Sequence, residues 1–143
     1  MKPEKSLYHK FKKNCPNLLI TSIECWNIGG IPDVLLWTPS CENVLVELKY
    51  CDSNKTNKVK FSPHQILYFY QRKNLTSGQD RNLILVGHLE KLAKGDPLTR
   101  VKVIPKLYGS NSVEGLMLDI REVKPLATSW DQIEKFISNQ KNN

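Results

Sequence analysis

The sequence predicts a mixed α/β fold in which a central mixed β-sheet is flanked by helices, in the order helix, three strands, helix, strand. Apolar runs of strand length alternate with clusters of turn formers, and two segments with helical spacing open with capping residues. The apolar run 82–87 follows the helix that is expected to open at Ser62, so it is expected to pair in parallel after a crossover. A length of 143 residues fits a single domain, 1–143.

The first helix is expected over residues 3–13, where Pro3 suits the first turn. Its apolar face consists of Leu7, Tyr8 and Phe11. Glu4 falls in the middle of that face, which leaves two interpretations open. Its carboxylate points toward the body of the protein, or it is an ordinary first-turn glutamate that complements the helix dipole.

The second helix opens at Ser62 and runs to about Lys73. Ser62 is a suitable N-cap, Pro63 fits the first helical position, and Gln65 completes a capping box. The same pattern begins at Ser129 and predicts a last helix that reaches Ile137.

Strands are expected at 18–26, from about Asp33 to Trp37, and at 44–50. The segment between the last two is rich in turn formers, which predicts an antiparallel hairpin. Further strands are expected at 101–104 and 115–120, with a less defined register.

Two acids and a lysine lie on the predicted hairpin. Asp33 is near the start of one strand and Glu47, 14 positions later, is near the end of the next, so the hairpin brings them together. Lys49 follows Glu47 by two residues and therefore points to the same face of the sheet. Ionised side chains on apolar strands are rare unless they are paired or bind a metal. The plainer alternative is a surface Glu47–Lys49 pair and an unrelated turn aspartate.

The composition favours a polyanionic partner, because the net charge is +7 and the pI is near 9.3. We expect no membrane span and no secretory signal, since no apolar run is long enough. The four cysteines form no C-x-x-C pair, which suits reduced thiols in a cytoplasm, that of the host if the chain is encoded by a phage. The side chains expected to contact DNA are Lys55, Lys58, Lys60, His64, Arg72 and Lys73.

Three short motifs in this order resemble the PD-(D/E)xK nuclease superfamily. They are Gly30-Ile31-Pro32-Asp33, Val46-Glu47-Leu48-Lys49 and Ser62-Pro63-His64-Gln65. Within the superfamily they are most similar to the VRR-NUC group and to small phage-type nucleases that resemble Holliday-junction resolvases. The resemblance covers about residues 1–88 and implies a restriction-endonuclease-like αβββαβ core, with 100–139 as an elaboration. An arginine pair that names the VRR group has no obvious counterpart here.

The resemblance also implies roles for particular residues. Asp33, Glu47 and the backbone carbonyl of Leu48 would bind Mg²⁺ or Mn²⁺, and Lys49 would be the catalytic lysine. The additional acid of the family would be Glu4, with Glu24 as its competitor. Gln65 would project toward the site, although a capping role alone is an equal alternative.

Taken together, these features predict a metal-dependent DNA endonuclease that selects branched or junction DNA. A domain of this length has little surface for long duplex readout, and no helix-turn-helix or zinc module is evident. Cutting both sides of a junction predicts a homodimer. The alternatives are a site-specific restriction or homing endonuclease and a non-catalytic nucleic-acid-binding module.

Overall fold

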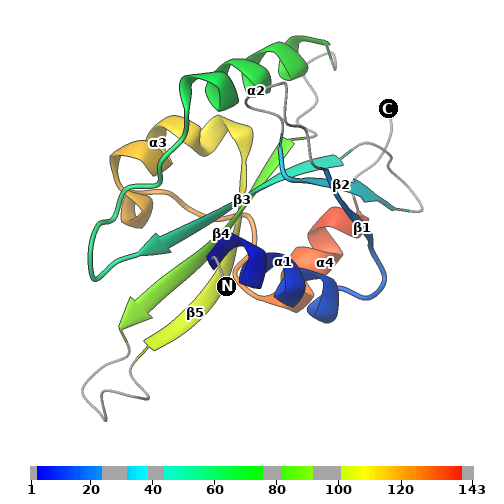
Figure 1. The fold of residues 1–143 in the computed structure, drawn as a ribbon, viewed down its shortest axis with the longest axis horizontal. Helices are drawn as coiled ribbons and strands as arrows, with labels where there is room; N and C mark the ends of the chain where they lie inside the picture. The colour runs from blue at the N-terminus through cyan, green and yellow to red at the C-terminus, as the bar shows by residue number, and fades with distance from the viewer. Residues whose placement is uncertain (1–2, 24–31, 39–43, 76–81, 92–100, 140–143) are drawn as a thin grey trace.

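The fold is a five-stranded mixed sheet with helices on both faces (Figure 1). The computed structural model describes residues 3–23, 32–38, 44–75, 82–91 and 101–139. The strands, in the order in which they pair, are β1 (Leu19–Ser22), β2 (Val34–Trp37), β3 (Val44–Asp52), β4 (Asn82–Lys91) and β5 (Val101–Gly109). The helices are α1 (Pro3–Asn14), α2 (Pro63–Leu75), α3 (Val113–Leu118) and α4 (Trp130–Ser138), with the 3₁₀ turns η1 (Ser110–Ser112) and η2 (Ile120–Glu122).

The strand pairing follows the predicted connections. β1, β2 and β3 pair antiparallel in sequence order, as expected for neighbouring strands joined by turns. β3 and β4 pair in parallel, with α2 as the crossover between them, which confirms the prediction for the apolar run 82–87. β5 then returns antiparallel to β4. The observed order is therefore helix, three strands, helix, strand, followed by an additional strand and helices.

Each face of the sheet has its own hydrophobic core. α1 and α4 cover one face, where Leu7 and Phe11 of α1 pack with Ile133 and Ile137 of α4 over the sheet. α2 and α3 cover the other face, and the core there includes Phe69 and Leu116 (Figure 1). The two faces divide β3 by the ordinary alternation of a strand. Val44, Val46 and Leu48 join the core beneath α1 and α4, so Glu47 and Lys49 face the side of α2.

The predicted strand at 115–120 is wrong, because this segment forms α3 and the start of η2. Val113, Leu116 and Ile120 are all buried, and their spacing of three and four residues is that of a helix face. Asp119 then ends α3 and accepts a hydrogen bond from the amide of Arg121, which starts the 3₁₀ turn. A short apolar run such as Leu116-Met117-Leu118 fits either structure, and here packing against the sheet decides for the helix.

The other boundaries differ by a few residues. β5 continues past the predicted 101–104 to Gly109, and it tolerates Pro105 because it is the last strand of the sheet. The predicted first strand, 18–26, is β1 as far as Ser22, and its end lies outside the described residues. α2 extends two residues beyond Lys73. Among the described residues, no helix is both long and apolar enough to cross a membrane.

Candidate active site

The β2–β3 hairpin brings the two predicted acids together. Val34 pairs with Val46, so Asp33 and Glu47, the next residue on each strand, stand opposite each other. The amide of Leu48 donates a 2.9 Å hydrogen bond to Oδ2 of Asp33, which fixes that carboxylate against β3. This confirms the predicted hairpin and the meeting of the acids.

Glu47 is a buried acid, with 3% of the residue exposed. Its Oε1 accepts a 2.8 Å hydrogen bond from Nε2 of Gln65, while Oε2 has no hydrogen-bond partner among the described residues. Burial, and after it the neighbouring Asp33 carboxylate, raise the pKa of Glu47 to about 9, although the nearby Lys49 ammonium acts to lower it. The described cations therefore do not offset the charge that two ionised carboxylates would have at this position.

Lys49 lies beside the acid pair and is held there by neutral groups. Its Nζ is 3.9 Å from Oε1 of Glu47, at the outer limit of an ion pair, but it donates a 3.0 Å hydrogen bond to Oε1 of Gln65. The same ammonium lies 4.8 Å from the ring centroid of Phe61, a cation–π distance. The side chain of Lys49 is 16% exposed, so its contacts are largely shielded from water.

Gln65 has both of the roles that the sequence left open. Its side-chain Oε1 accepts a 2.9 Å hydrogen bond from the backbone amide of Ser62, and the backbone amide of Gln65 donates a 3.1 Å hydrogen bond to Oγ of Ser62. This is the reciprocal capping box. The same side chain bridges Glu47 and Lys49. The first turn of α2 is thus tied to the acid pair on β3 through one amide.

We expect Gln65→Ala to lower the free energy of unfolding by about 1–3 kcal/mol, because it removes a cap and leaves the Glu47 carboxylate without its donor. Urea denaturation measures this loss. The matched control is Gln132→Ala, since Gln132 caps α4 through the amide of Thr128 and is exposed. Its expected loss is about 1 kcal/mol or less. Equal losses in the two variants would contradict a link between Gln65 and the acid pair.

Glu4 lies near the acid pair but is not joined to it. It lines a hollow of about 420 Å³ together with Asp33 and Leu48, and its own side chain is exposed. Glu4 is expected, in one of the two interpretations of the sequence, to point toward the body of the protein. It does line this hollow, but its side chain remains exposed. Its competitor, Glu24, lies outside the described residues. Within the described segments, no three histidine, cysteine or acidic side chains come close enough to enclose a metal ion by themselves.

The side chains expected to contact DNA are mostly free to do so. Lys55, Lys58 and Lys60, in the segment between β3 and α2, are exposed, as is His64 in the first turn of α2. Arg72 is half-buried, and the side chain of Lys73 is not described. Among the described side chains, the exposed Lys55, Lys58, Lys60 and His64 make no hydrogen bond to Asp33, Glu47 or Lys49.

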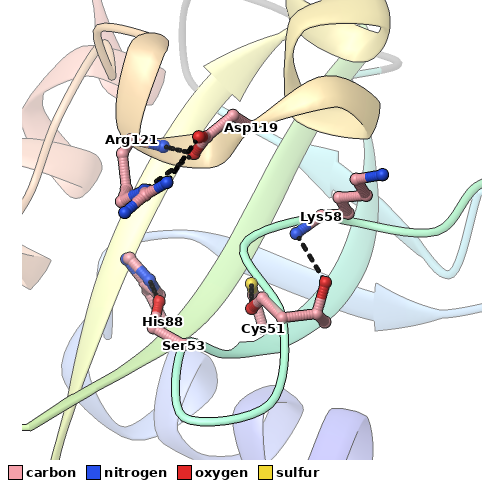
Figure 2. Close-up of polar contacts among 7 residues, drawn as sticks. Cys51, Ser53, Lys58, His88, Asp119 and Arg121 are labelled. Atoms are coloured by element: carbon pink, nitrogen blue, oxygen red, sulfur yellow. Dashed lines mark hydrogen bonds and ion pairs between the residues drawn. The ribbon is translucent and has the colours of Figure 1, made fainter.

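A second polar group, which the sequence did not indicate, lies where β3 and β4 end (Figure 2). His88 on β4 is buried, and its Nε2 is hydrogen-bonded to Oγ of Ser53. Arg121 binds Asp119 through two nitrogens, at 2.8 and 3.0 Å, and this lowers the pKa of Asp119. Strand alternation in β4 could have placed His88 on the face of α2, but nothing in the sequence links it to Ser53.

Comparison of the chain with protein-family models, with curated proteins and with solved structures gives no match. Two carboxylates, those of Asp33 and Glu47, lie next to each other on the sheet, and the ammonium of Lys49 lies alongside. Among the described residues, Oε2 of Glu47 has no hydrogen-bond donor. Oxygen ligands of this kind suit hard divalent cations.

Proposed function

We propose that this protein is a metal-dependent DNA endonuclease of the PD-(D/E)xK type that hydrolyses phosphodiester bonds and selects branched or junction DNA. The observation that supports it most is the buried Glu47 carboxylate beside Asp33, with one oxygen that has no donor in the part of the chain that the structure describes. Two adjacent carboxylates at low exposure repel each other unless a cation or a proton lies between them. A purely structural role would favour an apolar pair at this position.

The acid pair fits Mg²⁺ or Mn²⁺. In proteins Mg²⁺ commonly uses one or two carboxylates and completes its shell with water and a substrate phosphate. Asp33 and Glu47 would supply these carboxylates, and Glu4, which lines the neighbouring hollow, would be the additional acid of the site. A bound divalent cation would acidify a water molecule and offset negative charge on the phosphate.

The chain itself would position the reactants. Asp33 is oriented by the backbone amide of Leu48 and Glu47 by the side-chain amide of Gln65, so a hydrogen bond holds each carboxyl group in place. Lys49 would place its ammonium against the phosphate, where it offsets the charge that develops during attack. Gln65 holds that ammonium, so it is a positioning residue.

The charge of the protein supports a nucleic-acid substrate. A net charge of +7 and the exposed Lys55, Lys58 and Lys60 would attract the DNA backbone to a site that is itself acidic. Cleavage on both sides of a junction would need two sites related by symmetry, and we propose a homodimer for this reason. Sedimentation in the presence of a junction DNA tests that part of the proposal.

The metal site is tested by calorimetry with Mn²⁺. We expect wild type to take up Mn²⁺, Asp33→Ala to lose this uptake, and Asp131→Ala to retain it, because Asp131 is an exposed acid on α4. Uptake that is unchanged in Asp33→Ala would contradict the site. The same outcome would favour a non-catalytic module that binds nucleic acid.

The reaction is tested on a panel of junction, flap, nicked, single-stranded and duplex DNA, in Mg²⁺ and in Mn²⁺. We expect cleavage that is fastest on branched DNA. If wild type cuts no member of the panel in either metal, the proposed activity is wrong. Cleavage of one duplex sequence alone would instead identify a restriction or homing enzyme.

A further inference from the structure

The hollow beside Asp33 has a wall of a different character from the acid pair. Besides Glu4, its side on α1 consists of Lys5, Tyr8 and His9, and Ser22 of β1 also lines it. At about 420 Å³ it falls within the roughly 300–1,000 Å³ of pockets that hold small ligands. We call it the α1 hollow.

We propose that the α1 hollow holds an unpaired nucleotide of the DNA strand that is cut, next to the scissile phosphate. This inference rests on the proposed nuclease function. Asp33 belongs both to the acid pair and to the wall of the hollow, so the two share a boundary. A strand whose phosphate lies at the acid pair therefore has the hollow beside it for the adjoining nucleotide.

The wall of the hollow has the chemistry that a nucleotide requires. Tyr8 is half-buried and packs against the core beneath α1, which keeps its ring in place. The ring of His9 lies 5.6 Å from that of Tyr8, at 58°, and the ammonium of Lys12 lies 5.6 Å from the Tyr8 centroid. Rings that stack on bases, with cations near them for the backbone, are how single strands are bound without sequence preference.

The charged side chains around the α1 hollow would set the orientation of the bound nucleotide. Glu4 and Asp33 are acidic and repel a phosphate, whereas Lys5 is exposed at the same hollow. The phosphate that is not cut is therefore expected at Lys5, with the base against Tyr8 and His9. The carboxylates would remain toward the metal.

A larger cavity on the other face is a poorer candidate. It measures about 590 Å³ between α2 and α3, and its wall is mostly apolar, with Phe69, Tyr70 and Met117. The charged residue described in that wall is Glu114, which repels phosphate. The cavity also lacks a residue in common with the acid pair, so a nucleotide there would not adjoin the cleaved bond.

Occupation of the α1 hollow would select the DNA structure. A base that is stacked and paired in a duplex must be flipped out before it can enter a pocket, at a cost of a few kcal/mol. An unpaired nucleotide avoids this cost. Flaps, bulges and junctions with an unpaired nucleotide beside the cut would therefore bind more tightly than intact duplex.

The test measures fluorescence anisotropy of a fluorescein-labelled duplex and of the same duplex with one bulged nucleotide, in Mg²⁺. The protein carries Lys49→Met, so that the strands stay uncut. We expect the bulged DNA to bind about tenfold more tightly. Tyr8→Leu and His9→Ala should each lower this preference severalfold, and the exposed His9 is a site where substitution leaves the fold intact. Tyr70→Leu, an exposed aromatic at the other cavity, should leave it unchanged.

Equal affinity for the two DNAs would overturn the proposal, as would a preference that His9→Ala and a folded Tyr8→Leu leave intact. Loss of the preference in Tyr70→Leu alone would also overturn it, in favour of the larger cavity. Failure of the nuclease proposal is recognised separately, by the absence of cleavage when Lys49 is present. A preference for bulged DNA that depends on Tyr8 and His9 would still support the hollow in that case.

Discussion

Lys49→Met is expected to lower the rate of Mg²⁺-dependent DNA cleavage by about 10²–10³-fold, the usual cost of removing one preorganised group that stabilises charge in a transition state. Methionine keeps the length and the apolar stem of the side chain. It loses the ammonium that hydrogen-bonds to Gln65 and lies over Phe61. The fold should therefore persist while the positive charge beside Glu47 disappears.

Single-turnover cleavage of a junction substrate measures this effect directly. Lys60→Met is the matched control, because it removes the same single positive charge from the protein. Lys60 is exposed, and no described contact joins it to the acid pair. Its expected cost is confined to weaker DNA binding and is relieved at low salt. A Lys49→Met variant that cuts at nearly the wild-type rate would remove this residue from the mechanism.

Glu47→Gln is expected to stabilise the metal-free protein, and the gain should grow with pH. The pKa of Glu47 is about 9 in the folded protein against an ordinary value of 4.5. Between these values the unfolded chain has lost the proton that the folded chain retains, so wild-type stability falls as pH rises through this window. At pH 7 the accumulated cost is about 3 kcal/mol, which glutamine does not incur.

Chemical denaturation in EDTA at pH 5, 7 and 8 measures this difference. Glutamine still offers an amide oxygen to Nε2 of Gln65, so the neighbouring contact is kept. Glu114→Gln serves as the control, since Glu114 is exposed and its substitution should change stability by less than about 0.5 kcal/mol at each pH. Mn²⁺ should raise the unfolding temperature of wild type more at pH 8 than at pH 5. Parallel stability profiles for wild type and Glu47→Gln would contradict the raised pKa.

Most of the candidate site could be predicted from the sequence because it is built from short-range geometry. One turn between two apolar strands is enough to place Asp33 against Glu47, and strand alternation adds Lys49. The capping box at Ser62 located the start of α2, and with it Gln65. The parallel pairing of β4 followed from a buried run after a crossover helix.

The features that could not be predicted depend on contacts between distant segments. The pKa of Glu47 reflects how completely the sheet and α2 cover it, and local pattern does not report this. Phe61 comes under the Lys49 ammonium only because the segment before α2 folds back over β3. The α1 hollow likewise exists only once α1 docks on the hairpin. The predicted strand at 115–120 is wrong because the four apolar residues of this segment suit either a strand or a short helix, and packing alone decides between them.

The groups that orient the acid pair all come from one continuous stretch, from Asp33 to Gln65. The last third of the chain, with β5, α3 and α4, contributes buried volume to both cores. Evolution could therefore remodel this last third, provided that it kept its apolar bulk, without disturbing the chemistry. Conversely, the stretch from Asp33 to Gln65 is the unit to transplant when the arrangement of the acid pair is to be rebuilt on another scaffold.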